Sequence, residues 1–320
     1  MGGSGYRSIS GSAGLVAKFL VFFCLAQLGL SVLVNEEPLV LNYHNGPLLT
    51  SKPNLDVHLI WYGKFSAVQR SILGDFVESL GAGAPLPSVF SWWKTTEGYK
   101  DLSNEVPAPT KTHTRLGKQK LDEAYSLGKS LKRTDIGTLV LRTVSSGALP
   151  VDDNAVYLLL TSQDVIVERF CMGSCGSHAS IVVGKTALPY AWVGNSESQC
   201  PGQCAWPFHQ PLYGPQSPPL LPPNGDVGID GMIINVATVL AGAVTNPFNS
   251  GYFQGQSSAP LEAVSACPGI YGTGAYPGFP GNLLVDNTTG ASYNAHGVKG
   301  RMFLLPAIWN PATRSCKTLV

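Results

Sequence analysis

The sequence predicts a mixed fold of the α/β or α+β class, in which one mixed sheet packs against helices and disulfide bonds hold the loops. In the first half of the chain, segments with helical spacing alternate with short runs rich in β-branched and aromatic residues. The second half carries all but one of the seven cysteines, and the 36 glycines and 24 prolines of the chain indicate many loops. A single domain of this kind is therefore expected.

Residues 1–31 have the features of a secretory signal peptide. The basic residues Arg7 and Lys18 lead into an uncharged, apolar run at 19–34. A membrane-spanning helix needs about 20 apolar residues, which is more than this run supplies. We therefore expect cleavage between residues 26 and 35, export from the cell, and one mature domain at 32–320 without a membrane span.

The mature chain begins with a strand and turn at 39–49, where Asn-Gly-Pro supplies the turn residues. Residues 54–63 alternate and are rich in strand-forming side chains, so they are expected to form a strand. Residues 66–81 have apolar positions at helical spacing between a capping serine and a terminal glycine, which predicts a helix. The further expected elements are a short helix at 88–101, a polar strand at 111–121, a helix at 134–144, and strands at 154–162, 178–185 and 190–195.

Two aromatic pairs fall within these elements, Trp61-Tyr62 and Trp92-Trp93. Such pairs can stack on sugar rings, but large aromatic side chains more often fill cores. Core packing is the preferred interpretation, and a sugar-binding platform is the alternative.

Six cysteines remain once the signal peptide removes Cys24. An even number in an exported chain favours three disulfide bonds, with fifteen possible pairings. Two Cys-x3-Cys pairs are followed by His178 and His209, a pattern that could suit zinc, but zinc requires thiolates that stay reduced. We expect disulfides, no metal and no cofactor, with both histidines as hydrogen-bonded loop residues. The six cysteines are Cys171, Cys175, Cys200, Cys204, Cys267 and Cys316.

A proline-rich loop and a buried helix follow the second cysteine pair. Residues 206–226 hold seven prolines in twenty-one positions, so this segment is expected to cross the surface as an ordered loop. Residues 232–244 are almost entirely apolar and end before Pro247, which predicts a buried helix.

Thr238 and Gly242 are spaced i and i+4 on this expected helix. Two histidines at this spacing bind one ion in the His-Glu-x-x-His helix of zinc peptidases. Neither residue is a strong zinc ligand, and Val239 cannot act as the general base. The three positions therefore mark a degenerate zinc helix.

No catalytic residue is identified from the sequence. The mature chain has no Gly-x-Ser-x-Gly elbow, and the paired carboxylates of a glycosidase come from distant segments, so spacing cannot reveal them. Asp226 and Asp230 are expected to cap the buried helix. The nominal carboxylate candidates are Asp56, Asp75, Asp226, Asp230 and Glu262.

The C-terminal part, 266–316, is expected to form hairpins that close on a final strand at 301–309. Asn287 begins an Asn-Thr-Thr acceptor and is predicted to carry an N-glycan on an exposed turn. Without Arg7 and Lys18, 19 basic and 20 acidic residues leave a formal charge of −1. This balance gives no electrostatic reason to expect nucleic acid as a partner.

Several longer motifs stand out in the mature chain. They include "IWYGKF", "ERFCMGSCGSH", "NGDVGIDGMIIN" and "CPGIYGTGAYPG", with further stretches at 43–49, 91–100, 190–216, 246–255 and 291–301. With these motifs together, the mature chain resembles the plant phosphate-induced protein 1 family, which includes Exordium and the Exordium-like proteins. The resemblance implies an exported protein of the apoplast or cell wall, linked to cell expansion and to growth, including brassinosteroid-responsive growth. It supplies no catalytic residue. More distant relatives with a His-Glu-Leu-Ala-Glu-type stretch at 238–242 would imply a metallopeptidase-like scaffold that is degenerate here.

Three functional hypotheses follow. The first is a protein that binds a cell-wall polysaccharide or an apoplastic or receptor protein without catalysis. The second is a cell-wall polysaccharide hydrolase or transglycosylase, with carboxylates and exposed tryptophans in a cleft. The third is a zinc-peptidase-like protein.

Overall fold

The computed structural model describes residues 1–3, 38–102 and 112–320 of the chain. The expected signal peptide and its cleavage site fall on residues 4–37 and so lie outside the described part. Residues 39–320 form one unit.

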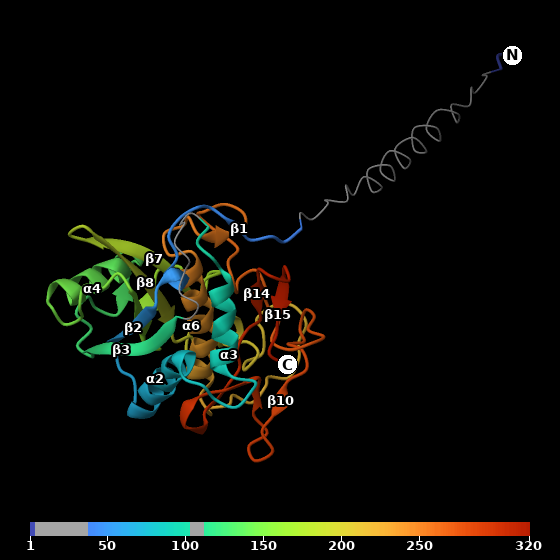
Figure 1. The fold of residues 1–320 in the computed structure, drawn as a ribbon. Coiled ribbons are helices and arrows are strands. Elements are labelled where there is room, and N and C mark those ends of the chain that lie inside the picture. Colours follow the sequence, from blue (N-terminus) through green and yellow to red (C-terminus); the bar gives the residue numbers. More distant parts are fainter. Residues whose placement is uncertain (4–37, 103–111) are drawn as a thin grey trace. The chain divides into compact units, whose positions relative to one another are not determined.

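A five-stranded sheet with strand order β3-β2-β5-β8-β7 organises this unit (Figure 1). Neighbouring strands run parallel, except that β7 runs antiparallel to β8. The predicted mixed sheet with packed helices is therefore confirmed. The strands are β2 (Asn54–Tyr62), β3 (His113–Asp122), β5 (Ala155–Thr161), β7 (Gly176–Val183) and β8 (Thr186–Gly194).

Helices cover both faces of the sheet. One face packs against α2 (Ala67–Gly81), α3 (Val89–Trp93) and α6 (Val227–Thr245), and the other face packs against α4 (Arg133–Ser145). The alternation of side chains along the strands explains this layering, because successive residues point to opposite faces. In β2, for example, Leu59 and Trp61 point towards α6, whereas Ile60 and Tyr62 point towards α4.

Helix α2 begins as its sequence predicts. The Ser66 hydroxyl accepts a hydrogen bond from the Gln69 backbone N–H, and the Gln69 side chain accepts one from the Ser66 N–H, which completes a capping box.

Helix α6 is long and apolar enough to cross a membrane by composition, but most of its length is buried inside the unit. Its side chains pack in the core against β2, β5 and β8, and this packing accounts for its apolar character.

Short elements complete the described chain. They are β1 (Asn42–Tyr43), the 3₁₀ turns Leu49–Ser51, Lys94–Gly98 and Val298–Gly300, β4 (Ser130–Leu131), β6 (Ile166–Val167), α5 (Pro201–Cys204), β9 (Tyr252–Phe253), β10 (Leu284–Val285), β11 (Ser292–Tyr293), β12 (Ala295–His296), β13 (Met302–Phe303), β14 (Ile308–Asn310) and β15 (Ser315–Lys317). The proline-rich residues 206–226 contain neither helix nor strand, as expected for a surface crossing.

The prediction of one final strand at 301–309 is wrong. Two short strands, β13 and β14, occupy this stretch, and each pairs with a different partner, β12 and β15 respectively. Pro306 lies between them and has no N–H for a ladder. The carbonyl of Pro306 instead accepts a hydrogen bond from Trp92 Nε1 at 2.7 Å.

The aromatic pairs are core residues. All four side chains are buried: Trp61, Tyr62, Trp92 and Trp93. The alternative of a sugar platform at these residues is therefore wrong, and any sugar site must use other aromatic side chains.

Candidate functional site

The two Cys-x3-Cys pairs bond to each other. Disulfides join Cys171 to Cys200 and Cys175 to Cys204, and a third joins Cys267 to Cys316. The turn before β7 is thereby tied to helix α5. The prediction of three disulfides is confirmed, and none of these sulfurs is free to bind zinc.

The degenerate zinc helix lies within α6. The Thr238 hydroxyl donates to the Ile234 carbonyl of its own helix at 2.9 Å, and Val239 is buried in the core. Neither side chain offers a metal ligand.

Two side chains from elsewhere in the chain lie over Gly242. His178 of β7 places Nε2 at 2.9 Å and 3.0 Å from the two carboxylate oxygens of Glu262. A Cβ atom added to Gly242 would lie 2.7 Å from Glu262 Oε2 and 2.9 Å from His178 Nε2. A methyl group at this position would therefore press on the ends of both side chains.

The His178–Glu262 pair is largely buried. The side chains are 9% and 13% exposed, and Asn246 at the end of α6 donates to Glu262 Oε1 at 2.7 Å. His178 Nδ1 is buried without a partner among the described residues. Because His178 lies in strand β7, the prediction that it is a loop residue is wrong. His209 does lie in an exposed loop.

This cluster does not rebuild a zinc-peptidase site. Such a site uses three protein ligands, two of them from the helix. Here the α6 positions Thr238 and Gly242 contribute none, and two ligand-type side chains of the described chain, His178 and Glu262, meet over the helix. The arrangement instead fits a polar clamp that joins β7 to the segment after α6.

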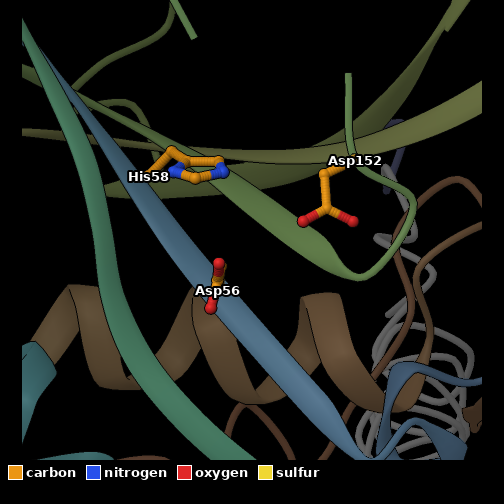
Figure 2. Close-up of side chains that lie close together, drawn as sticks. All are labelled: Asp56, His58 and Asp152. Atoms are coloured by element: carbon orange, nitrogen blue, oxygen red, sulfur yellow. The ribbon is translucent and has the colours of Figure 1, made fainter. Parts of the chain in front are cut away.

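A second polar cluster holds Asp56, His58 and Asp152, whose ligand-type atoms all lie within 4.8 Å of one another (Figure 2). The Lys118 backbone N–H donates to His58 Nδ1 at 2.9 Å, so the proton of the neutral ring lies on Nε2. Metal binding at Nε2 needs a lone pair there, which this tautomer lacks. Burial lowers the pKa of His58, which favours the neutral ring. The ligand-type atoms of Asp56, His58 and Asp152 therefore do not fit a metal ion.

The remaining carboxylate candidates make structural contacts. Asp56 accepts hydrogen bonds from Arg115, and Asp226 caps α6 by accepting from the Ile229 N–H at 2.9 Å. Asp75 is buried; burial raises its pKa, but hydrogen bonds from Lys299 and Arg301 outweigh this and hold the pKa below its usual value. The contacts of Asp75 join α2 to the C-terminal segment.

Asp230 is not a helix cap, contrary to expectation. Its carboxylate accepts hydrogen bonds from the backbone N–H and the side-chain amide of Asn224 at 2.9 and 2.7 Å. Burial, together with the negative charge of Asp226, raises the pKa of Asp230 to about 7, although hydrogen bonds from Asn224 and from the Asp226 backbone lower it.

We expect this carboxyl group to make folding pH-dependent. Between the unfolded pKa near 3.8 and the folded pKa of about 7, the folded state keeps a proton that the unfolded state has lost. The free energy of unfolding should therefore fall as the pH rises through this window, by about 4 kcal/mol in total. In Asp230→Asn this contribution should vanish. Urea unfolding from pH 4 to pH 8 checks it, with exposed Asp153→Asn as the control; equal pH profiles for wild type and Asp230→Asn would contradict it.

An aromatic groove lies on the surface, formed by the proline-rich loop and the segment after Cys267. It encloses about 480 Å³, and Trp206, Tyr213 and Tyr276 contribute its three aromatic rings. Tyr213 and Tyr276 are 84% and 65% exposed. The other lining residues are Pro211, Pro215, Pro268, Gly269, Ile270, Ala275, Pro277 and Gly278. None of the described lining residues carries a charge.

The walls of the groove approach each other closely at one point, and the groove has a polar extension. A Cβ atom at Gly278 would lie 2.5 Å from Pro215, so the two walls approach closely only because residue 278 is glycine. One neighbouring hollow shares Trp206, Pro211 and Tyr213 with the groove, and a second shares Pro211. They add the side-chain amides of Gln199, Gln203, Gln210 and Gln216. The aromatic groove therefore continues into an amide-rich surface.

A family model described as the phosphate-induced protein 1 conserved region matches residues 41–319. The chain belongs to the phosphate-induced protein 1 family. It is 55% identical to Protein EXORDIUM-like 2 of Arabidopsis thaliana over 94% of this chain and 96% of that protein. It is 54% identical to Protein PHOSPHATE-INDUCED 1 of Nicotiana tabacum, over 93% and 94% of the two chains, and 52% identical to Protein EXORDIUM of Arabidopsis thaliana, over 96% and 99%. No solved structure matches the chain.

In this member of the phosphate-induced protein 1 family, sequence reasoning missed the groove aromatics and the His178–Glu262 pair. The glycine at 242 was an available signal, because glycine inside an apolar helix often marks a close approach. Asn287 lies exposed on the turn between β10 and β11, where its glycosylation stays a prediction.

Proposed function

We propose that this protein is exported to the apoplast or cell wall, where it promotes cell expansion and growth, including brassinosteroid-responsive growth. It acts by binding a neutral wall polysaccharide in the aromatic groove, without catalysis. Membership of the phosphate-induced protein 1 family supports the link to growth. The three disulfides support export, because such bonds persist in oxidising compartments.

The aromatic groove is the observation that carries the binding proposal. A pyranose ring presents a face of C–H groups that packs on an aromatic ring, while its hydroxyl groups bond to amides at the edge. Trp206, Tyr213 and Tyr276 offer such rings. Gln210 offers an amide that no described residue engages, whereas the amide nitrogens of Gln199 and Gln216 already donate to backbone carbonyls. The uncharged lining favours a neutral chain over an acidic one.

A wall hydrolase is less well supported. Glycoside hydrolysis uses two carboxyl groups that flank the scissile bond. The described lining of the groove includes no Asp or Glu. The candidate carboxylates lie elsewhere, and each has a structural partner. Arg115 contacts Asp56, Lys299 and Arg301 contact Asp75, the α6 N-terminus contacts Asp226, Asn224 contacts Asp230 and His178 contacts Glu262.

The binding proposal predicts that Tyr213→Ala combined with Tyr276→Ala weakens retention on neutral wall polysaccharides by about tenfold or more, because two exposed stacking faces are lost. Thermal stability should stay near that of the wild type, since both rings are exposed. Retention of the purified full-length mature protein on arrayed neutral polysaccharides measures this, with acidic pectins on the same array.

The matched control is Tyr213→Phe with Tyr276→Phe, which keeps both rings and should keep most of the retention. Equal binding of the alanine and wild-type proteins would contradict the proposal. Retention by membrane-protein extracts but by no polysaccharide would replace the polysaccharide with a receptor protein as the ligand.

A further inference from the structure

Strand β7 forms one edge of the main sheet. It pairs with β8 on one side, and no strand of the described chain pairs with its other side (Figure 1). The strand is regular over all eight residues, from Gly176 opposite Val193 to Val183 opposite Thr186. It therefore presents a regular row of backbone groups.

The hydrogen-bonding pattern between β7 and β8 shows which backbone groups of β7 point away from β8. The Gly194 N–H donates to the Cys175 carbonyl, so these two opposed residues form a hydrogen-bonded pair. Such pairs alternate with non-hydrogen-bonded pairs along an antiparallel ladder. His178, Ser180 and Val182 fall in the non-hydrogen-bonded pairs, which aims their N–H and C=O groups at the open edge. Pro189 is opposite Ser180, where β8 needs no donor towards β7.

These six outward groups have no hydrogen-bond partner among the described residues. Ser180 is exposed and Val182 is 68% exposed. Donors and acceptors repeated at every second residue are the complement of an extended polypeptide backbone. A sugar or a lipid headgroup does not carry this spacing of paired donors and acceptors.

The edge lacks the features that usually block strand addition. Charged side chains, prolines and bulges protect exposed edges. At the other edge of the sheet, β3 carries Arg115, Lys118 and Lys120 and pairs with β2 through a register shift. Residues 176–183 contain no charged residue and no proline, and their pairing has no register shift.

The edge strand β7 is also held in place near its N-terminal end. The Cys175–Cys204 disulfide fixes the residue before β7, and the His178–Glu262 pair clamps the strand to the segment after α6. A binding surface that is already ordered loses less conformational entropy when a ligand binds.

We propose that β7 binds an extended, uncharged segment of another polypeptide by strand addition. The partner segment supplies free N–H groups at alternate residues opposite His178, Ser180 and Val182. A second copy of this chain fits less well, because a two-fold pair centred on Ser180 sets Val182 of one copy against His178 of the other. That contact would bury the polar His178–Glu262 pair further without a polar partner, which costs free energy.

The test uses the full-length, disulfide-bonded mature protein and a capped peptide of alternating threonine and valine. Amide hydrogen exchange is followed by NMR at His178, Ser180 and Val182. At millimolar peptide we expect exchange at these three amides to slow by at least about tenfold, because added ladder bonds protect them. The fully N-methylated peptide, which has the same side chains but no N–H, should give no slowing.

Two variants make the test specific. Ser180→Pro removes the central outward N–H but none of the bonds to β8, so it should fold and lose the peptide-dependent protection at His178 and Val182. Ser180→Val keeps the N–H and should keep the protection. Unchanged exchange in the wild type at millimolar peptide, or equal protection in Ser180→Pro, would overturn the proposal. Protection that rises with protein concentration in the absence of peptide would also overturn it, in favour of self-pairing.

Discussion

Replacing both Cys267 and Cys316 by serine is expected to lower the free energy of unfolding by about 4 kcal/mol, because this disulfide closes a loop of 49 residues in the unfolded chain. The bond ties the segment that lines the aromatic groove to β15 at the C-terminus. Guanidinium unfolding of the oxidised proteins measures the change, and groove binding should weaken with it.

The matched comparison is the pair of parallel disulfides. Removing Cys171–Cys200 alone should cost less, about 2.5 kcal/mol, because Cys175–Cys204 still holds the same two segments and only a small ring is opened. Removing both should cost about 6 kcal/mol, since a loop of 29 residues is then also opened. Equal costs for the Cys267–Cys316 bond and for one member of the parallel pair would contradict this account.

Glu262→Ala is expected to lower the free energy of unfolding by about 3 kcal/mol, because it leaves His178 and the Asn246 amide buried without their shared acceptor. The surface glutamate Glu123, whose side chain is 52% exposed beside Arg70, provides the control. Glu123→Ala should cost less than about 1 kcal/mol. Urea unfolding of both variants gives the comparison.

Gly242→Ala tests the same clamp from the helix side. Alanine favours a helix interior over glycine by about 1 kcal/mol, so an exposed site would be stabilised. Here the new methyl group would contact Glu262 and His178, and we expect net destabilisation of about 1 to 2 kcal/mol. A stabilised Gly242→Ala, or a Glu262→Ala as stable as Glu123→Ala, would show that the pair does not hold β7 in place.

Local patterns predicted the elements of the sheet domain well. The cap at Ser66, the apolar spacing of 66–81 and the continuous apolar run of 232–244 are properties of neighbouring residues, and they gave α2 and α6. The even number of cysteines in an exported chain predicted three disulfides. The pairing of these cysteines could not be predicted from the sequence, because six cysteines can form three disulfides in fifteen ways.

The site depends on contacts between distant segments, which sequence patterns do not reveal. His178 and Glu262 are 84 residues apart, and Tyr213 and Tyr276, which meet in the groove, are separated in the sequence by α6 and β9. The sugar-platform alternative failed for the same reason: Trp61 and Trp92 are as aromatic as Trp206, and only the fold determines which rings reach the surface.

Parallel assays of retention and product formation test the non-catalytic binding proposal most directly. The purified, disulfide-bonded protein is incubated with arrayed neutral wall polysaccharides, and both bound protein and new reducing ends are measured. We predict retention that depends on Tyr213 and Tyr276, with no new reducing ends above a protein-free control. New reducing ends that disappear in a single carboxylate variant such as Glu262→Gln would contradict the proposal and make the protein an enzyme.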